Sequence, residues 1–150
     1  MKLAEALILR SDLQKRLEQL RQRMTASALA QEGEQPPEQP ETLLQELDRA
    51  TDQLEDLIAR INLTNAAEVR EGKTLTELLS RREVLQQKIS VLHSLLEAAS
   101  HTVLRGSRSE VKIHSTVNVA ALRKTADGLS QELRLLDTAI QSANWLTDLR

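Results

Sequence analysis

Apolar residues recur at every third or fourth position through most of this chain, in four separate blocks. The last block is the clearest, with Leu122, Ala126, Leu129 and Leu133 on one line. Such spacing places side chains on one face of an α-helix, which repeats about every 3.6 residues. The sequence therefore predicts four long helices, at about residues 3–30, 42–64, 75–104 and 119–144.

The blocks are separated by residues that end or begin helices. Residues 31–41 contain all three prolines, Gly33 and several glutamates, which predicts an acidic, proline-rich loop in solvent. Gly72 and Gly106 mark the other breaks, and Asn118 is a candidate N-cap for the last helix. Short connections favour antiparallel neighbours. The predicted fold is therefore all-α, an antiparallel four-helix bundle forming a single domain over residues 1–150.

Composition excludes several other classes of protein. The chain has no Cys, Phe or Tyr and a single Trp, Trp145, which argues against disulfide scaffolds, thiolate sites and β-rich folds. The formal net charge of −2 gives no strong positive electrostatic field, which argues against a dedicated nucleic-acid-binding protein. Apolar runs are too short for a membrane span, and the first residues do not resemble a signal peptide. We therefore expect a cytoplasmic protein without nucleic-acid or membrane partners.

One segment departs from the helical pattern. Near residues 109–117, Val111, Ile113 and Ser115 alternate with polar residues, which is typical of a short extended or β segment. A strand must pair its backbone groups, so its partner could be another copy of the chain.

Some predicted helices carry more apolar surface than a single core requires. A second line follows Leu43, Ala50 and Leu57 beside the main stripe of the second helix, and another runs through Val84, Val91 and Leu95. One wide stripe per helix is enough for a four-helix core. The surplus predicts a homo-oligomer.

A glycine lies inside the last predicted helix, where it costs about 1 kcal/mol relative to alanine. This residue is Gly128. We expect it to mark the close approach of a neighbouring helix.

No constellation of residues predicts catalysis, a metal or a cofactor. Residues 67–74 fit a loose phosphate-loop pattern, but a helix precedes them where that loop needs a strand. The carboxylates of Asp48, Asp52 and Glu55 share a helix face without matching acids on the next helix, so a solvated face is favoured. The histidines lack partners at ligand spacing.

One predicted bundle end combines polar residues with the only indole. Asn62, Thr64 and Asn65 lie where the apolar stripe of the second helix stops, and an antiparallel bundle would bring Asn144 and Trp145 there. A hydrogen-bonded end cap with the indole packed on it is favoured over a ligand or subunit contact. Thr74 in the nearby turn, and Arg108 and Glu110 near the opposite end of the bundle, complete the set of candidates. The candidate interface or binding residues are Asn62, Thr64, Asn65, Thr74, Arg108, Glu110, Asn144 and Trp145.

Five short motifs resemble a family of small bacterial helical proteins labelled septicolysin or left without a function. They are M-K-L-A-E-A-L at the start, R-I-N-L-T-N at 60–65, T-L-T at 74–76, R-S-E-V at 108–111 and A-N-W at 143–145. The resemblance implies an all-helical, oligomeric protein, and the label implies a pore-forming cytolysin. The chain departs from these relatives by lacking aromatic residues around 105–113.

The sequence favours a non-enzymatic, self-associating helical bundle with a role in assembly or interaction. Two alternatives stay open. One is a membrane-active, cytolysin-like protein, because amphipathic helices can expose apolar faces to lipid. The other is a small-ligand binder or enzyme at the bundle end that holds Asn65 and Trp145.

Overall fold

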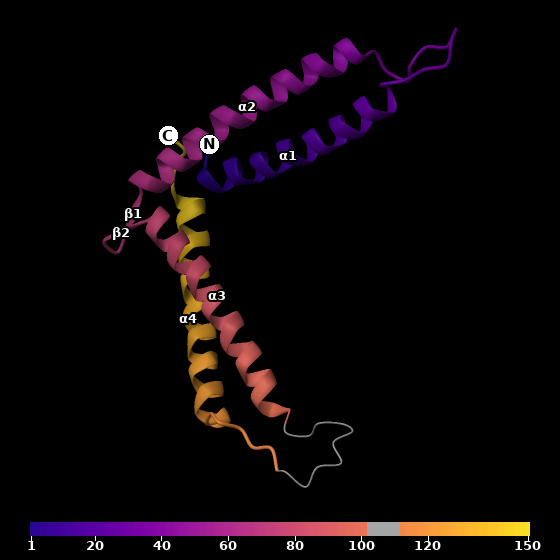
Figure 1. The fold of residues 1–150 in the computed structure, drawn as a ribbon. Coiled ribbons are helices and arrows are strands. Elements are labelled where there is room, and N and C mark those ends of the chain that lie inside the picture. Colours follow the sequence, from indigo (N-terminus) through magenta and orange to yellow (C-terminus); the bar gives the residue numbers. More distant parts are fainter. Residues whose placement is uncertain (102–111) are drawn as a thin grey trace. The chain divides into compact units, whose positions relative to one another are not determined.

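Four helices make up most of the chain. The computed structural model describes residues 1–101 and 112–150. The helices are α1 (Leu3–Ala26), α2 (Pro40–Ala67), α3 (Leu75–Ser100) and α4 (Val119–Leu146). Two short strands, β1 (Val69–Arg70) and β2 (Lys73–Thr74), lie between α2 and α3 along the chain (Figure 1). The predicted all-α class with four long helices is confirmed.

Two helices end before their predicted bounds. α3 ends at Ser100, where the prediction reached residue 104, and residues 102–104 lie outside the described part of the chain. α1 stops at Ala26 and not at residue 30. The Ser27 backbone N–H donates to the Arg23 carbonyl oxygen at 3.1 Å, and the Ser27 hydroxyl accepts from the Glu38 backbone N–H at 3.3 Å. Ser27 is buried by these contacts, so the chain turns there. In α2, Pro40 occupies the first turn, where its fixed φ suits a helix.

The start of α4 agrees with its expected cap. The Asn118 Oδ1 accepts the Ala121 backbone N–H at 3.0 Å, which satisfies one of the unpaired donors of the first turn. At their other ends, α2 and α4 continue to Ala67 and Leu146, two to three residues past the predicted bounds.

The described residues form two compact units. Unit 1 contains Met1–Thr74 and Ser142–Arg150, and unit 2 contains Leu75–Gln141. The single domain expected from the sequence stays a prediction.

In unit 1, α1 and α2 form an antiparallel pair. Its core contains Leu20, Leu43 and Ala50, with Leu17 and Met24 packed against them. The α2 line that faces α1 is therefore the one expected to be secondary. The stripe expected to be the main one is exposed or only partly buried except at its last residue, which is buried; it consists of Leu44, Leu47, Thr51, Leu54, Ile58 and Ile61. Both lines are apolar, so sequence spacing alone did not identify the one that α1 covers.

Ion pairs join the two helices of unit 1 near the 31–41 loop. The Arg23 guanidinium donates to Glu38 at 2.8 Å through Nε and lies 3.3 Å from Glu46 through Nη1. Arg23 lowers the pKa of the Glu38 carboxyl, and Glu38 and Glu46 together raise the pKa of Arg23. The sequence also predicts that Arg105, Arg108 and Lys112 approach this acidic loop; of these, Arg105 and Arg108 lie outside the described residues.

A tight hairpin connects α2 to α3. Val69 pairs with Thr74 and Arg70 with Lys73 in an antiparallel register. The two residues between the strands, Glu71 and Gly72, have φ values of 50° and 79°. Two residues with positive φ form a tight turn, and the twist of this turn matches the twist of the two strands that it joins. The segment that resembled a phosphate loop is thus a hairpin that follows a helix.

The expected extended segment does not form a strand in its described part. Residues 112–118 are irregular, while residues 109–111 lie outside the described part of the chain. The Ser115 hydroxyl is close to both backbone polar groups of Val117, at 2.9 Å from the carbonyl oxygen and 3.3 Å from the nitrogen. This local turn competes with strand pairing, as serine side chains commonly do.

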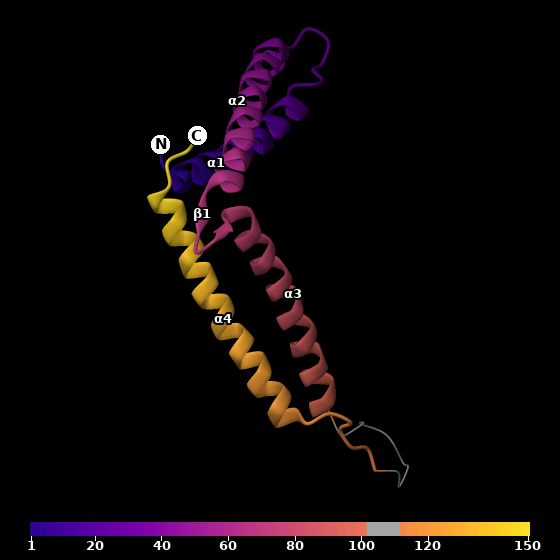
Figure 2. The ribbon, with the colours of Figure 1, turned by 90° about the vertical axis from the view of Figure 1, so that its left-hand side faces the viewer.

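In unit 2, α3 and α4 lie side by side and run in opposite directions (Figure 2). Their facing lines bury Leu85 and Leu96 on α3 and Ala126 and Ile140 on α4. Many other residues on these lines are only half buried. Two helices alone therefore cover the apolar lines of unit 2 incompletely.

The expectation that Gly128 marks a close helix contact is wrong among the described residues. A Cβ atom at this position would meet none of them within 4 Å, and the residue lies in the interior of α4. The glycine therefore lowers the stability of the helix without a packing gain from the described part of the chain.

We accordingly expect Gly128→Ala to raise the free energy of unfolding by about 0.5–1 kcal/mol, because alanine restricts the unfolded chain and favours the helix. Urea unfolding followed by circular dichroism measures this. A lower stability of the variant would show that a surface from another molecule closely covers this part of α4.

Candidate functional site

The two ends of the described chain meet in unit 1, next to α2 (Figure 1). The Leu3 backbone N–H donates to the Thr147 carbonyl oxygen at 2.9 Å, and the Leu149 N–H donates to the Met1 carbonyl oxygen at 2.9 Å. These bonds flank a bridge between Lys2 and Asp148. The last residues are thus held against the first ones by a short antiparallel pairing.

A charge pair reinforces this pairing. The Lys2 Nζ lies 2.9 Å from the Asp148 Oδ1 and donates to the Leu146 carbonyl oxygen at 3.2 Å. The hydrogen bond and the positive charge of Lys2 lower the pKa of Asp148. Asp148 is largely exposed, so the ion pair contributes little by itself.

Thr64 attaches the end of the chain to α2. Its buried hydroxyl donates to the Arg60 carbonyl oxygen at 2.8 Å and accepts the Arg150 backbone N–H at 3.0 Å. The Arg60 Nε donates to the Arg150 carbonyl oxygen at 2.7 Å. The threonine and the arginine therefore bind both backbone polar groups of one residue.

Arg70 of the β1–β2 hairpin also reaches the C-terminal residues. Its Nη2 donates to the buried Thr147 hydroxyl at 3.3 Å and pairs with Glu68 at 2.7 Å. The Nε atom of Arg70 is buried and has no hydrogen-bond partner among residues 1–101 and 112–150. These contacts make the region a structural junction that joins the chain ends, α2 and the hairpin.

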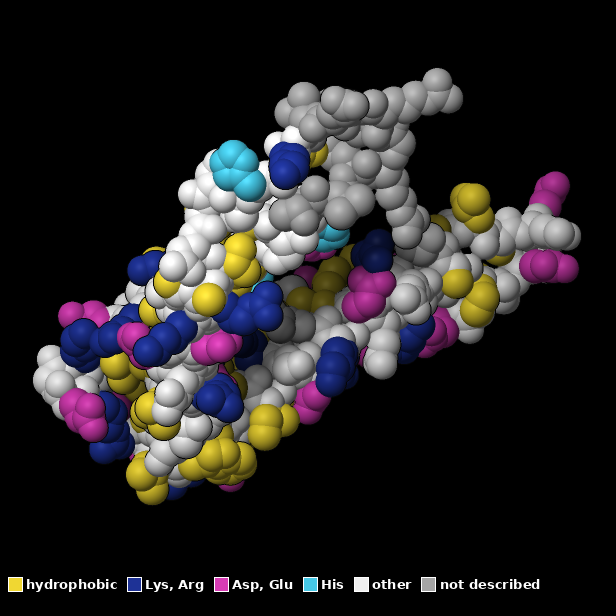
Figure 3. Space-filling model, turned by 90° about the horizontal axis from the view of Figure 1, so that it is seen from below, with side chains coloured by type: hydrophobic (Ala, Val, Ile, Leu, Met, Phe, Trp, Pro, Cys, Tyr) yellow, Lys and Arg dark blue, Asp and Glu magenta, His cyan; other side chains and the backbone are white. Residues whose placement is uncertain are grey.

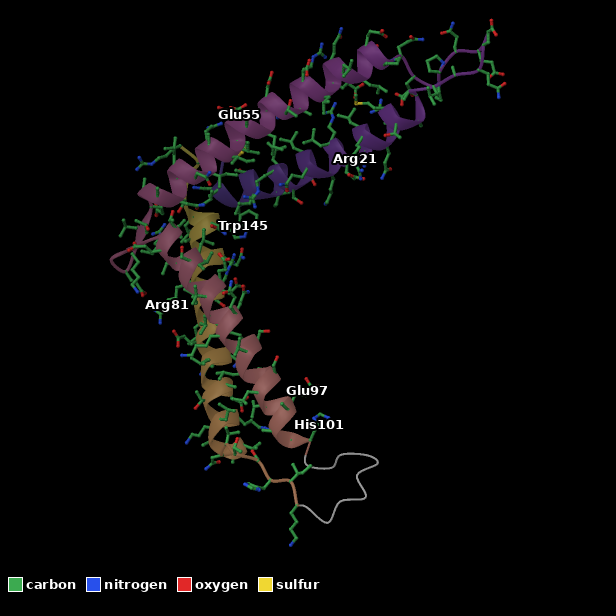
Figure 4. All side chains as sticks on the ribbon, in the orientation of Figure 1. Arg21, Glu55, Arg81, Glu97, His101 and Trp145 are labelled. Atoms are coloured by element: carbon green, nitrogen blue, oxygen red, sulfur yellow. The ribbon has the colours of Figure 1, made fainter. Side chains whose placement is uncertain are left out.

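The residues expected at this end occupy different environments. Thr64 and Asn144 are buried, Asn65 and Thr74 are partly buried, and Asn62 is exposed. Trp145, at the C-terminal end of α4, is 55% exposed, so the described residues cover less than half of it (Figure 4). Arg108 and Glu110 lie outside the described residues. Sequence reasoning missed Lys2, Arg60, Arg70, Thr147 and Asp148, because contacts between chain ends leave no periodic signal.

A shallow groove runs along one face of α2. Its lining is mostly apolar and comes from one face of this helix. The lining residues are Thr51, Leu54, Glu55, Ile58, Ala59 and Asn62. Leu44, which is 48% exposed, and Leu47 extend the same line toward the start of the helix. This face is available in unit 1 because α1 packs on the adjacent line of α2.

A second apolar line is exposed on α3 in unit 2. Val84, Val91 and Leu95 are 63%, 67% and 41% exposed, and Leu135 on α4 is also exposed. Ion pairs between the two helices, Arg81 with Glu132 and Arg82 with Asp137, join α3 to α4. Figure 3 shows hydrophobic side chains at the surface between the charged ones.

A small depression lies at the C-terminal end of α3. It is lined by Leu95, Ala98, Ala99, His101 and residues 113–117. The His101 Nδ1 lies 2.6 Å from the Glu97 carbonyl oxygen, so that nitrogen bonds within the helix terminus (Figure 4). Across residues 1–101 and 112–150, no group of three or more His, Asp or Glu side chains is arranged to hold a metal ion.

A protein-family comparison matches residues 10–149 to a family of unknown function, DUF6847. The chain belongs to this family. A crystal structure described as a functionally unknown conserved protein from Corynebacterium diphtheriae has 41% sequence identity to the chain and a TM-score of 0.92. The similarity covers 100% of this chain and 99% of that one. No curated protein matches.

These comparisons support a small all-helical protein family that occurs in bacteria. Both DUF6847 and the solved structure are described as functionally unknown, and neither carries the name septicolysin. Within the described part of the chain, no helix combines the length and apolar character needed to cross a membrane.

Proposed function

We propose that this member of DUF6847 is a non-enzymatic, cytoplasmic, self-associating protein with a role in assembly or in interaction with other proteins. The supporting observation is the exposed apolar line on α3, formed by Val84, Val91 and Leu95. These residues recur at helical spacing, so they lie on one line along the helix, which we call the α3 strip.

The strip adds to an incomplete core. In unit 2, α3 and α4 bury only part of their facing lines, and Leu135 is also exposed. Contiguous exposed apolar surface typically marks an interaction site in a folded protein. We take a second copy of the chain as the partner, because every copy carries this surface and meets other copies wherever the protein is present.

Sedimentation velocity tests the proposal with the double variant Val84→Ser and Val91→Ser. We expect the variant to shift from the assembled to the monomeric form, because each substitution removes apolar area from the strip. Both valines are largely exposed, so the helical circular-dichroism signal should be retained.

The matched control is Val69→Ser, which changes an exposed valine in the β1–β2 hairpin of unit 1. It should sediment like the unmodified protein. Equal sedimentation of all three proteins in the assembled form would exclude the α3 strip, and monomeric sedimentation of the unmodified protein would exclude self-association.

Neither of the two alternatives has an observation that favours it over self-association. The pore-forming hypothesis rests on the septicolysin resemblance alone. The ligand-binding hypothesis concerns Asn65 and Trp145, in the region where the neighbouring Thr64 holds the end of the chain.

A further inference from the structure

The groove on α2 has a charged edge. Asp48, Asp52 and Glu55 are exposed along it, and none of them makes an ion pair within the described residues. By helical spacing, the two arginines of α2, Arg49 and Arg60, project from the side of the helix opposite the groove. The groove therefore combines an apolar floor with a negative rim.

The exposed strip on α3 has complementary features. Lys88 lies between Val84 and Val91 on the same line, is exposed and makes no ion pair in the described structure. The strip thus presents apolar side chains with one positive charge near its middle.

The two surfaces also match in length. The groove extends from Thr51 to Asn62 and the strip from Val84 to Leu95, so each covers about 16 Å of helix. When the helices are antiparallel and Lys88 is placed opposite Glu55, Val84 falls beside Ile58. Toward the other end, Leu95 then falls beside Leu47, which extends the line of the groove, while Val91 falls beside Thr51 and Asp52. Apolar residues therefore meet at both ends of the contact.

We propose that α3 of one copy docks antiparallel into the α2 groove of a second copy, with Lys88 paired to Glu55. This inference rests on the proposed self-association and specifies the surface that covers the α3 strip. Because the two surfaces differ, the contact is heterologous. A closed dimer therefore needs two such contacts, with α3 of each copy in the α2 groove of the other.

Charge reversal tests the pairing. Glu55→Lys and Lys88→Glu each place like charges together, and we expect each to raise the dissociation constant for self-association about tenfold. The chain that carries both substitutions restores opposite charges and should return to within about threefold of the unmodified protein. Sedimentation equilibrium gives the dissociation constants.

Two control variants change the same charges outside both surfaces. Asp127→Lys and Lys124→Glu alter exposed residues of α4 and should leave the dissociation constant within about twofold. Unchanged dissociation constants in both Glu55→Lys and Lys88→Glu would overturn the docking while leaving self-association intact. Weakening in both without recovery in the double variant would overturn the direct pairing. A strictly monomeric unmodified protein would remove the proposed function as well.

Disulfide cross-linking tests the orientation, because the chain has no cysteine of its own. Ile58→Cys and Val84→Cys are prepared separately, one with an affinity tag, and mixed under mild oxidation. A mixed disulfide dimer supports the antiparallel contact. A mixed dimer between Ile58→Cys and Val91→Cys, with none from Val84→Cys, would overturn it, since with Lys88 opposite Glu55 this pair meets only when the helices are parallel.

Discussion

Leu20→Ala is expected to lower the free energy of unfolding by about 3–4 kcal/mol, the largest effect expected of a single substitution in unit 1. Leu20 is fully buried between α1 and α2, where it forms a core cluster with Leu43 and Ala50. Removing its side chain loses apolar burial and leaves a cavity, because Leu43 and Ala50 are held by their own helix. Denaturant unfolding followed by circular dichroism gives the difference.

The control for this prediction is Leu29→Ala, which makes the same chemical change at a leucine that is 89% exposed. Its effect should stay within about 0.5 kcal/mol. A loss below about 1 kcal/mol for Leu20→Ala would contradict the α1–α2 packing of unit 1.

Deleting residues 148–150 is expected to lower the free energy of unfolding by about 2–4 kcal/mol, since three hydrogen bonds and an ion pair disappear. The lost hydrogen bonds join Leu149 to Met1, Arg150 to Thr64, and Arg60 to Arg150. Hydrogen exchange should also accelerate at Leu3, whose N–H bonds to Thr147 beside the deleted residues.

The matched control, Asp148→Asn, removes only the exposed ion pair with Lys2 and should change the free energy of unfolding far less than the deletion does. Because Lys2 lowers the pKa of Asp148 in the folded protein, the contribution of the pair is present above the unfolded pKa, near 3.8. It is lost as the pH falls through the lower folded pKa. A deletion no more harmful than Asp148→Asn would show that the pairing of the chain ends does not stabilise unit 1.

The four helices were predictable because each repeats apolar residues over many turns and is bounded by residues that end helices. Asn118 caps α4 where expected, and the prolines fall in the loop before α2. The end of α1 was missed because it depends on Ser27, whose hydroxyl accepts from the distant Glu38. A contact across eleven positions of an irregular loop leaves no local pattern.

The partly buried lines show a second limit of sequence reasoning. On α2, the lines through Leu43 and Leu44 are both apolar, and only the position of α1 decides that Leu43 is buried. Because both lines are apolar and α1 covers only one of them, α2 keeps an exposed apolar line. The line that α1 leaves uncovered is the floor of the α2 groove.

The candidate site was predictable only in part. Thr64 was selected as part of a polar bundle end, and the structure shows it holding the backbone of Arg150. Its partner Arg60 was missed, because a single charged residue on a helix resembles any solvated residue. Trp145 was selected for its rarity, yet its burial depends on tertiary contacts that composition does not reveal.

Multi-angle light scattering on the unmodified protein tests the central claim most directly. Self-association predicts a molar mass at least twice that of the 16.8 kDa chain at about 100 μM, falling toward the chain mass on dilution. A mass of 16.8 kDa at every concentration up to about 100 μM would contradict it.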